Sequence, residues 1–317
     1  MQIMEYLQQQ TAAIAVPRRV GKDRHKEVRT HIADEMKRLG LEPFYGGDFI
    51  IEQQAEYAQH DGGSETLYNI AGISRGNTQE AAPVLVGAHY DSIIAGECAD
   101  DNATSVAAML YMAGEFSRLE HERSIIFAAF DAEEPPYFGS PAMGSEQFMR
   151  QFFNEQGPSL SIIMDLLAHK SSIMADKIAC SGAENSPELL GMLRSASRED
   201  LAIVPVTEPC VQELSDHRNI LSRNYDYLFF SSGHWPGYHN EEDTIDNVDF
   251  DKLVRFNHIL KDIITMSASH RGAYETGNCR DAIQQDCWQI IGRAIGCAEN
   301  DSIEDMALKI IQIKYRE

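Results

Sequence analysis

The chain has 317 residues, 43% of them hydrophobic, which is enough for one large α/β domain with or without an appendage. Its 49 acidic and 27 basic residues give a net charge of −22, which repels phosphate backbones and argues against nucleic-acid binding. No apolar run approaches 18 residues, so no membrane span is expected. The N-terminus lacks the pattern of a secretory signal, and the six cysteines form no CxxC pair, so free thiols and a cytoplasmic location are expected.

The first elements predicted are one helix and two strands. Residues 22–39 carry apolar side chains at helical spacing, and Gly40 ends the pattern. Segments 49–58 and 67–74 are typical of strands, and the turn-rich HDGGSE at 60–65 separates them.

From residue 83 onward, short apolar runs alternate with amphipathic segments. The predicted buried strands are 83–88, 124–130, 159–167 and 225–232. The predicted helices are 103–117, 145–153, 187–196 and 250–268. This alternation predicts an α/β fold, a three-layer α/β/α sandwich with a mostly parallel mixed central sheet.

The composition changes near residue 271, after a linker-like stretch. Segments 280–296 and 302–314 are predicted amphipathic helices, and Ser302 with Asp305 resembles a capping box. We therefore expect a main domain over 1–270 and a helical C-terminal extension over 271–317. The extension is interpreted as a packed layer, a cover, or a contact between copies in a homo-oligomer.

Several side chains with catalytic chemistry lie at predicted strand ends, where ligands of open α/β sheets gather. His89 and Asp91 form an H-x-D motif in which Asp91 can hold the second ring nitrogen of a metal-bound histidine. Asp165 stands alone in the apolar run SLSIIMDLL, where an unpaired carboxylate is costly and a cation would stabilise it. The alternative for His89 and Asp91 is an exposed histidine beside a turn aspartate. The alternative for Asp165 is a buried salt bridge or a capped turn.

Two pairs of adjacent acids follow the same logic. Asp100 and Asp101 precede a predicted helix, where acids often act as caps, and the functional interpretation has Asp100 bridging two ions. Glu133 and Glu134 follow a buried strand, so that one can bind metal while the other serves as a general base; a solvated loop is the alternative.

His239, preceded by Tyr238, lies in a loop between the last predicted strand and a long helix. A lone histidine in a loop is usually solvent-facing. In combination, however, two histidines and three carboxylates suit a pair of zinc-like ions that share one aspartate. Such a pair activates water and polarises a carbonyl, so the pattern indicates a metal-dependent hydrolase.

In this order the motifs resemble the zinc aminopeptidase family of co-catalytic, dizinc metallopeptidases, which is related to glutamate carboxypeptidase and glutaminyl cyclase. The resemblance runs from about Val16 to Ile264. The motifs that carry it are Pro17-Arg18, LYNIAGI, GAHYDS, ADDNATSVAAML, the Glu-Glu strand end, MGS, SDH and YHNEEDTIDN.

The resemblance implies two Zn²⁺ ions per chain and hydrolysis of a peptide or small amide, most simply by aminopeptidase action. It implies that Glu133 is the general base, that Tyr238 stabilises the oxyanion, and that a cis peptide follows Asp100. One ion would be held by His89, Asp100 and Asp165, and the other by Asp100, Glu134 and His239.

The chain departs from the family pattern in the double proline of EEPPYFGS, in HWPG before Tyr238, and in the tail over 271–317. These departures bear on substrate specificity and assembly. Three alternative functions also stay open. They are a single-zinc acyltransferase resembling glutaminyl cyclase, a carboxypeptidase or other amide hydrolase, and a scaffold without catalysis.

Overall fold

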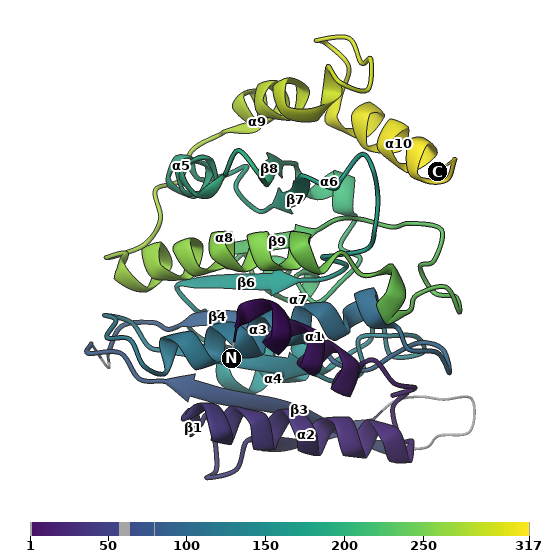
Figure 1. Ribbon diagram of the computed structural model, residues 1–317. Helices are drawn as coiled ribbons and strands as arrows, with labels where there is room; N and C mark the ends of the chain where they lie inside the picture. Colours follow the sequence, from purple (N-terminus) through teal and green to yellow (C-terminus); the bar gives the residue numbers. More distant parts are fainter. Residues whose placement is uncertain (1, 57–63, 79, 317) are drawn as a thin grey trace.

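One mixed sheet of nine strands forms the centre of the computed structural model, which describes residues 2–56, 64–78 and 80–316 (Figure 1). The strand order is β1-β3-β5-β4-β6-β9-β7-β8, and β2 pairs with β3. The pairs β5-β4, β4-β6, β6-β9 and β7-β8 are parallel, and the other pairs are antiparallel. The strands are β1 (Glu42–Pro43), β2 (Ile50–Glu56), β3 (Ser64–Ser74), β4 (Val84–His89), β5 (Ile125–Phe130), β6 (Leu160–Met164), β7 (Lys177–Ser181), β8 (Ala202–Pro205) and β9 (Tyr227–Ser231).

Helices cover both faces of the sheet. On one face α1, α3 and α8 contact one another, α2 lies against β3, and α5 lies between α8 and β8. On the other face α4 contacts β2, β3 and α7. The α-helices are α1 (Ile3–Ile14), α2 (Asp23–Leu39), α3 (Thr104–Phe116), α4 (Gly144–Phe152), α5 (Pro187–Ala196), α6 (Glu208–Val211), α7 (Arg218–Leu221), α8 (Phe250–Ser269), α9 (Arg280–Cys287) and α10 (Ile303–Lys314). The fold is therefore the predicted α/β/α sandwich with a helical extension.

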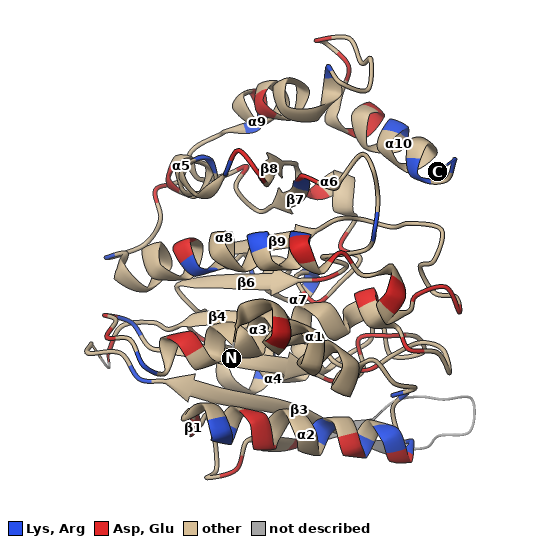
Figure 2. Cartoon of the chain, viewed as in Figure 1, with Lys and Arg blue, Asp and Glu red and all other residues tan. Residues whose placement is uncertain are grey.

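The central strands β4, β5 and β6 are buried along their whole length because both of their faces are covered. Successive residues alternate between two hydrophobic cores; Val84 and Val86 join one core, and Leu85 between them joins the other. These parallel strands end on the same side, at the right of Figure 1. Figure 2 shows acidic residues in several of the loops on that side.

Most predicted elements are confirmed to within a few residues, including the strands at 83–88, 124–130 and 225–232. The strand predicted over 159–167 ends at Met164, so Asp165 lies just beyond it. Positions 57 and 58 of the strand predicted over 49–58, and most of the turn predicted over 60–65, lie outside the described residues.

Helix α1 and the strands β7 and β8 were not predicted. Strands β7 and β8 are five and four residues long, and such short runs carry little periodicity.

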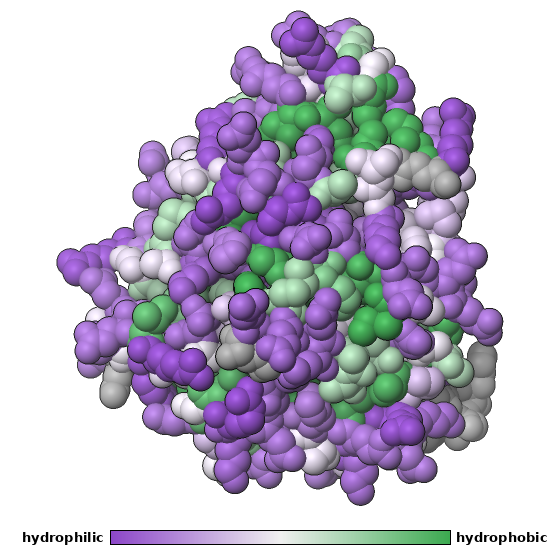
Figure 3. Space-filling model, viewed as in Figure 1, coloured by the Kyte–Doolittle hydropathy of each residue, from purple (hydrophilic) through white to green (hydrophobic). Residues whose placement is uncertain are grey.

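The tail forms the two predicted helical segments and packs on the sheet edge beyond β8 (Figure 1). Ile283, Ile291 and Met306 are buried in the same core as the sheet, and the capping box of Ser302 and Asp305 is present. Figure 3 shows apolar side chains over α9 and α10. The predicted domain boundary near 270 and the predicted self-association stay predictions.

None of the helices within the described residues combines the length and the apolar composition needed to cross a membrane.

Candidate metal centre

Strand order explains why distant side chains meet at one point. His89 is the last residue of β4, and Asp165 comes directly after β6, its parallel neighbour. Glu133 and Glu134 follow β5, the parallel neighbour of β4 on its other side. His239 lies in the loop after β9, which pairs with β6. The carboxyl ends of four adjacent parallel strands therefore carry the site.

Asp101 lies at the centre of this cluster, with one carboxylate oxygen toward each histidine. Its Oδ1 is 3.3 Å from Nε2 of His89, and its Oδ2 is 3.2 Å from Nε2 of His239. This is the arrangement that a carboxylate shared by two cations requires.

The remaining carboxylates divide between the two histidines. Oδ1 of Asp165 lies 3.6 Å from Nε2 of His89, and Oε2 of Glu134 lies 3.4 Å from Nε2 of His239. Within the described residues, three groups of three potential ligands have their ligand atoms within 4.8 Å of one another. Two of them share Asp101, namely His89 with Asp101 and Asp165, and Asp101 with Glu134 and His239; the third is His89, Glu133 and Glu134.

Unpaired buried atoms fit a pair of cations at these positions. Both ring nitrogens of His89, Oδ2 of Asp101, Oε1 of Glu134 and Oδ1 of Asp165 are buried without a hydrogen-bond partner. Buried polar groups of this kind are costly unless something satisfies them, and these are nitrogen and carboxylate oxygen atoms that zinc accepts. The donor set therefore suits two divalent ions.

The electrostatics of the cluster also fit bound cations. Burial and the negative charge of Asp101 raise the pKa of Glu134 to about 8. Burial would lower the pKa of His89, but Glu133 and Asp101 outweigh it and raise that pKa. The pKa of His239 is raised to about 10, because Asp101 and Glu134 outweigh its burial. Bound cations would relieve this crowding and favour the ionised carboxylates.

Asp100, predicted as the bridging ligand, is not part of the cluster. Its Oδ1 accepts a hydrogen bond of 2.6 Å from the backbone of Ala168, and its Oδ2 lies 2.9 Å from Nδ1 of His169. Its carboxylate thus holds the segment that follows Asp165, and Asp101 occupies the place predicted for Asp100. The cis peptide predicted after Asp100 lies one residue later, between Asp101 and Asn102.

Two other carboxylates fix the backbone of the ligand segments. Asp91 accepts hydrogen bonds of 3.1 Å from the N–H groups of both Glu133 and Glu134, and its Oδ1 lies 3.4 Å from Nδ1 of His89. Asp243 accepts hydrogen bonds from the N–H groups of Asp100 and Asp101, at 2.8 and 3.0 Å. Asp91 therefore lies where it can orient His89 as predicted, and it also anchors the Glu-Glu turn.

Glu133 and Tyr238, the other two predicted catalytic residues, also lie in this cluster. Oε2 of Glu133 is 3.9 Å from Nε2 of His89, and burial with the charge of Glu134 raises the pKa of Glu133 well above its usual value. The ring of Tyr238 stacks on His239 at 3.7 Å. Burial and the surrounding carboxylates raise the pKa of Tyr238, so its hydroxyl stays protonated.

Sequence reasoning missed three residues that shape the site. Arg18 is fully buried, and its guanidinium donates to four carbonyls of the segment that runs from Tyr90 to Asp101. Asp216 is buried with both oxygens unpaired, and burial raises its pKa to about 7. His169 holds Asp100. The motifs around Arg18 and Asp216 were noticed, but nothing in them gave either residue a role.

Ligand-type side chains at the strand ends of an α/β/α sandwich are typical of a metal-dependent enzyme. More particularly, the model of peptidase family M28 matches residues 69–264, which is more than half of the chain and includes the whole cluster. The chain belongs to that family.

Similarity to individual relatives is lower. The uncharacterized protein YfbL of Escherichia coli (strain K12) is 24% identical over 220 residues, which cover 58% of this chain and 65% of YfbL. Aminopeptidase YwaD of Bacillus subtilis (strain 168) is 37% identical over 78 residues, or 24% of this chain and 17% of YwaD. The chain thus aligns with less than two thirds of the length of either relative.

Solved structures share the fold. LapB from Legionella pneumophila has a TM-score of 0.69 at 17% identity, with 84% of this chain and 72% of LapB covered. An aminopeptidase from Aneurinibacillus sp. strain AM-1 has a TM-score of 0.68 at 14% identity, with coverage of 86% and 96%. Porphyromonas gingivalis glutaminyl cyclase has a TM-score of 0.65 at 18% identity, with coverage of 83% and 96%. At these identities the likeness concerns the fold alone.

Proposed function

We propose that this protein is a dizinc aminopeptidase that hydrolyses the first amide bond of a peptide. The observation that carries the proposal is the position of Asp101 between two histidines, where it completes two groups of three potential ligands. If a single ion were bound, one of the two carboxylate oxygens of Asp101 would face a histidine without a cation between them. Glu133 remains as a buried carboxylate beside the two groups, free to move a proton.

The residues of the cluster divide the reaction between them. A pair of divalent ions, when bound, would polarise the scissile carbonyl and acidify water. Glu133 would take a proton from the attacking water and deliver it to the leaving amine. Tyr238, which keeps its hydroxyl proton, would donate a hydrogen bond to the oxyanion of the tetrahedral intermediate. Asp91 and Asp243 would hold the ligand segments in place through their backbone contacts.

The fold likeness to glutaminyl cyclase keeps one alternative open, a single-zinc acyltransferase that cyclises N-terminal glutamine. Carboxypeptidase or other amide hydrolase action and a scaffold without catalysis are the other two. The candidate functions differ in the number of zinc ions bound per chain and in the substrates that are consumed. Two zinc ions and cleavage of amides with a free α-amine favour the aminopeptidase; one zinc and cyclisation of glutaminyl peptides favour the cyclase.

The test combines zinc content with one substitution. We expect two zinc ions per chain by elemental analysis and cleavage of aminoacyl chromogenic amides, but not of their N-blocked counterparts. Glu133→Gln should lower kcat by about 10²–10⁴-fold and leave both zinc ions bound, because Glu133 belongs to neither of the two ligand groups that share Asp101. Glu27→Gln, an exposed position on α2, is the control. Full turnover by Glu133→Gln, or a purified chain that holds no zinc under saturating conditions, would contradict the proposal.

A further inference from the structure

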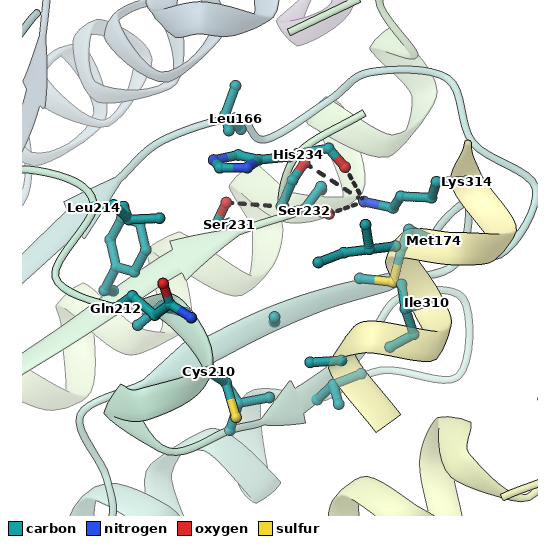
Figure 4. A pocket seen from close by; sticks show the side chains of 18 of the residues that line it. Leu166, Met174, Cys210, Gln212, Leu214, Ser231, Ser232, His234, Ile310 and Lys314 are labelled. Atoms are coloured by element: carbon teal, nitrogen blue, oxygen red, sulfur yellow. Dashed lines mark hydrogen bonds between the residues drawn. The ribbon is translucent and has the colours of Figure 1, made fainter. Parts of the chain in front are cut away.

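A cavity of about 310 Å³ opens beside the candidate metal centre, because Asp165 and Tyr238 are among the residues that line it. Figure 4 shows the side chains of its wall. On one side lie strands of the sheet, including Phe229 of β9. On the opposite side lie the C-terminal helices, which contribute Ile303, Ala307 and Ile310 from α10. The cavity is thus continuous with the cluster and reaches from it to the tail.

The lining of this cavity is mainly apolar. Val204, Val206 and Leu214 also line the cavity. The acidic and basic residues in its lining are Asp165 and Lys314. The ammonium of Lys314 donates to backbone carbonyls, so it is not offered to a ligand. The chemistry of the space therefore fits an aliphatic or aromatic side chain and disfavours a charged one.

The tail is fastened to the loop that leads to the site. Nζ of Lys314 donates to the carbonyl oxygens of Ser232, Gly233 and His234, the last two at 3.5 and 3.2 Å. Figure 4 shows these contacts joining the end of α10 to that segment. His234 in turn stacks on Tyr238 at 4.1 Å. Helix α10 is therefore held at a fixed distance from the cluster, as the wall of a binding pocket must be.

We propose that α10 forms the far wall of a pocket for the side chain of the substrate's first residue, and that this residue is large and apolar. The inference rests on the proposed aminopeptidase function. The cavity is large enough for one residue but not for a chain, and the leaving part of a peptide needs an exit to solvent. The pocket wall contributed by α10 lies beyond residues 69–264, so the tail sets the substrate preference of this chain.

The test fills the pocket from α10. In the full-length, zinc-loaded chain, Ala307→Leu should lower the ratio of kcat/KM for leucine p-nitroanilide over alanine p-nitroanilide by about tenfold or more. Leu308→Ala is the matched control, since Leu308 is the next residue of the same helix and is 58% exposed; the ratio should not change. Ile310→Ala should shift the preference in the opposite direction, toward phenylalanine p-nitroanilide. An unchanged ratio in folded Ala307→Leu and folded Ile310→Ala overturns the proposal.

Calorimetric binding of free leucine and free alanine separates this inference from the proposed function. If no amide is hydrolysed but leucine binds more tightly than alanine and Ala307→Leu removes that difference, the pocket stands and the aminopeptidase proposal fails. If amides are hydrolysed and none of the α10 variants alters selectivity or leucine binding, the pocket proposal fails and the function stands.

Discussion

Two adjacent aspartates have different surroundings, and only one of them belongs to the candidate metal centre. Asp100 and Asp101 are both buried, but Asp100 accepts hydrogen bonds from Ala168 and His169, whereas Asp101 faces His89 and His239. Asp243 holds the backbone N–H groups of both residues and thereby sets which side chain points into the cluster.

Substitution of each aspartate tests this assignment. Asp101→Asn should lower zinc content to below one ion per chain, because it weakens a ligand that both sites share. Asp100→Asn should retain more zinc, because the amide oxygen can still accept from the backbone of Ala168. Elemental analysis after dialysis at fixed zinc concentration measures both. Greater zinc loss in Asp100→Asn than in Asp101→Asn would restore the bridging role to Asp100.

The residue types of the site were readable from the sequence, but their exact assignment was not. His89, Glu134, Asp165 and His239 come together as predicted because each follows a recognisable strand. In the case of Asp100 and Asp101, both acids precede the same helix, and local sequence does not say which way each side chain turns.

At the scale of elements, the cluster depends on a loop as well as on the strand ends. The segment between β4 and α3 carries Asp91 and Asp101, and it has no regular strand to support it. Arg18 supplies that support, because its guanidinium donates to the carbonyls of Tyr90, Glu97, Cys98 and Asp101 at 2.6–3.1 Å. The buried side chain of Arg18 thus supplies the hydrogen bonds that a neighbouring strand would supply in a sheet.

Removal of this guanidinium should destabilise the fold and disturb the site. Arg18→Met leaves several buried carbonyls without donors, which we expect to cost on the order of 3–5 kcal/mol of unfolding free energy. Arg19→Met, at the exposed neighbouring position, should change it by less than about 0.5 kcal/mol. Urea denaturation followed by circular dichroism compares the two. Equal stability of the two variants would mean that water or a rearranged loop satisfies the carbonyls.

Across the whole molecule, the tail contacts both the cavity and the loop that leads to the candidate metal centre. The helices α9 and α10 extend the core at the β8 edge, line the cavity, and bind the 232–234 segment through Lys314. That segment continues directly to Tyr238 and His239. A change far along the chain can therefore affect a predicted metal ligand.

Loss of the Lys314 contacts should weaken zinc retention. Lys314→Met leaves three carbonyls unpaired and frees the loop before His239, so we expect faster zinc loss to a chelator and a destabilisation of about 1–3 kcal/mol. Lys309→Met is the matched control, because Nζ of Lys309 donates to the carbonyl of Gly296 within the tail itself. If both variants release zinc at the wild-type rate, the tail does not help to hold the loop that carries His239.

The sequence by itself determined the alternation of buried strands and amphipathic helices, the strand-end placement of the ligand-type residues, and the capped helix at the C-terminus. These features depend on local periodicity and on residue chemistry, which a single chain displays directly. Only the tertiary structure decided that Asp101 enters the cluster, that Arg18 supports it, and that α10 walls the adjoining cavity. Those outcomes depend on contacts between residues distant in sequence, such as Asp243 with Asp101 and Lys314 with Ser232.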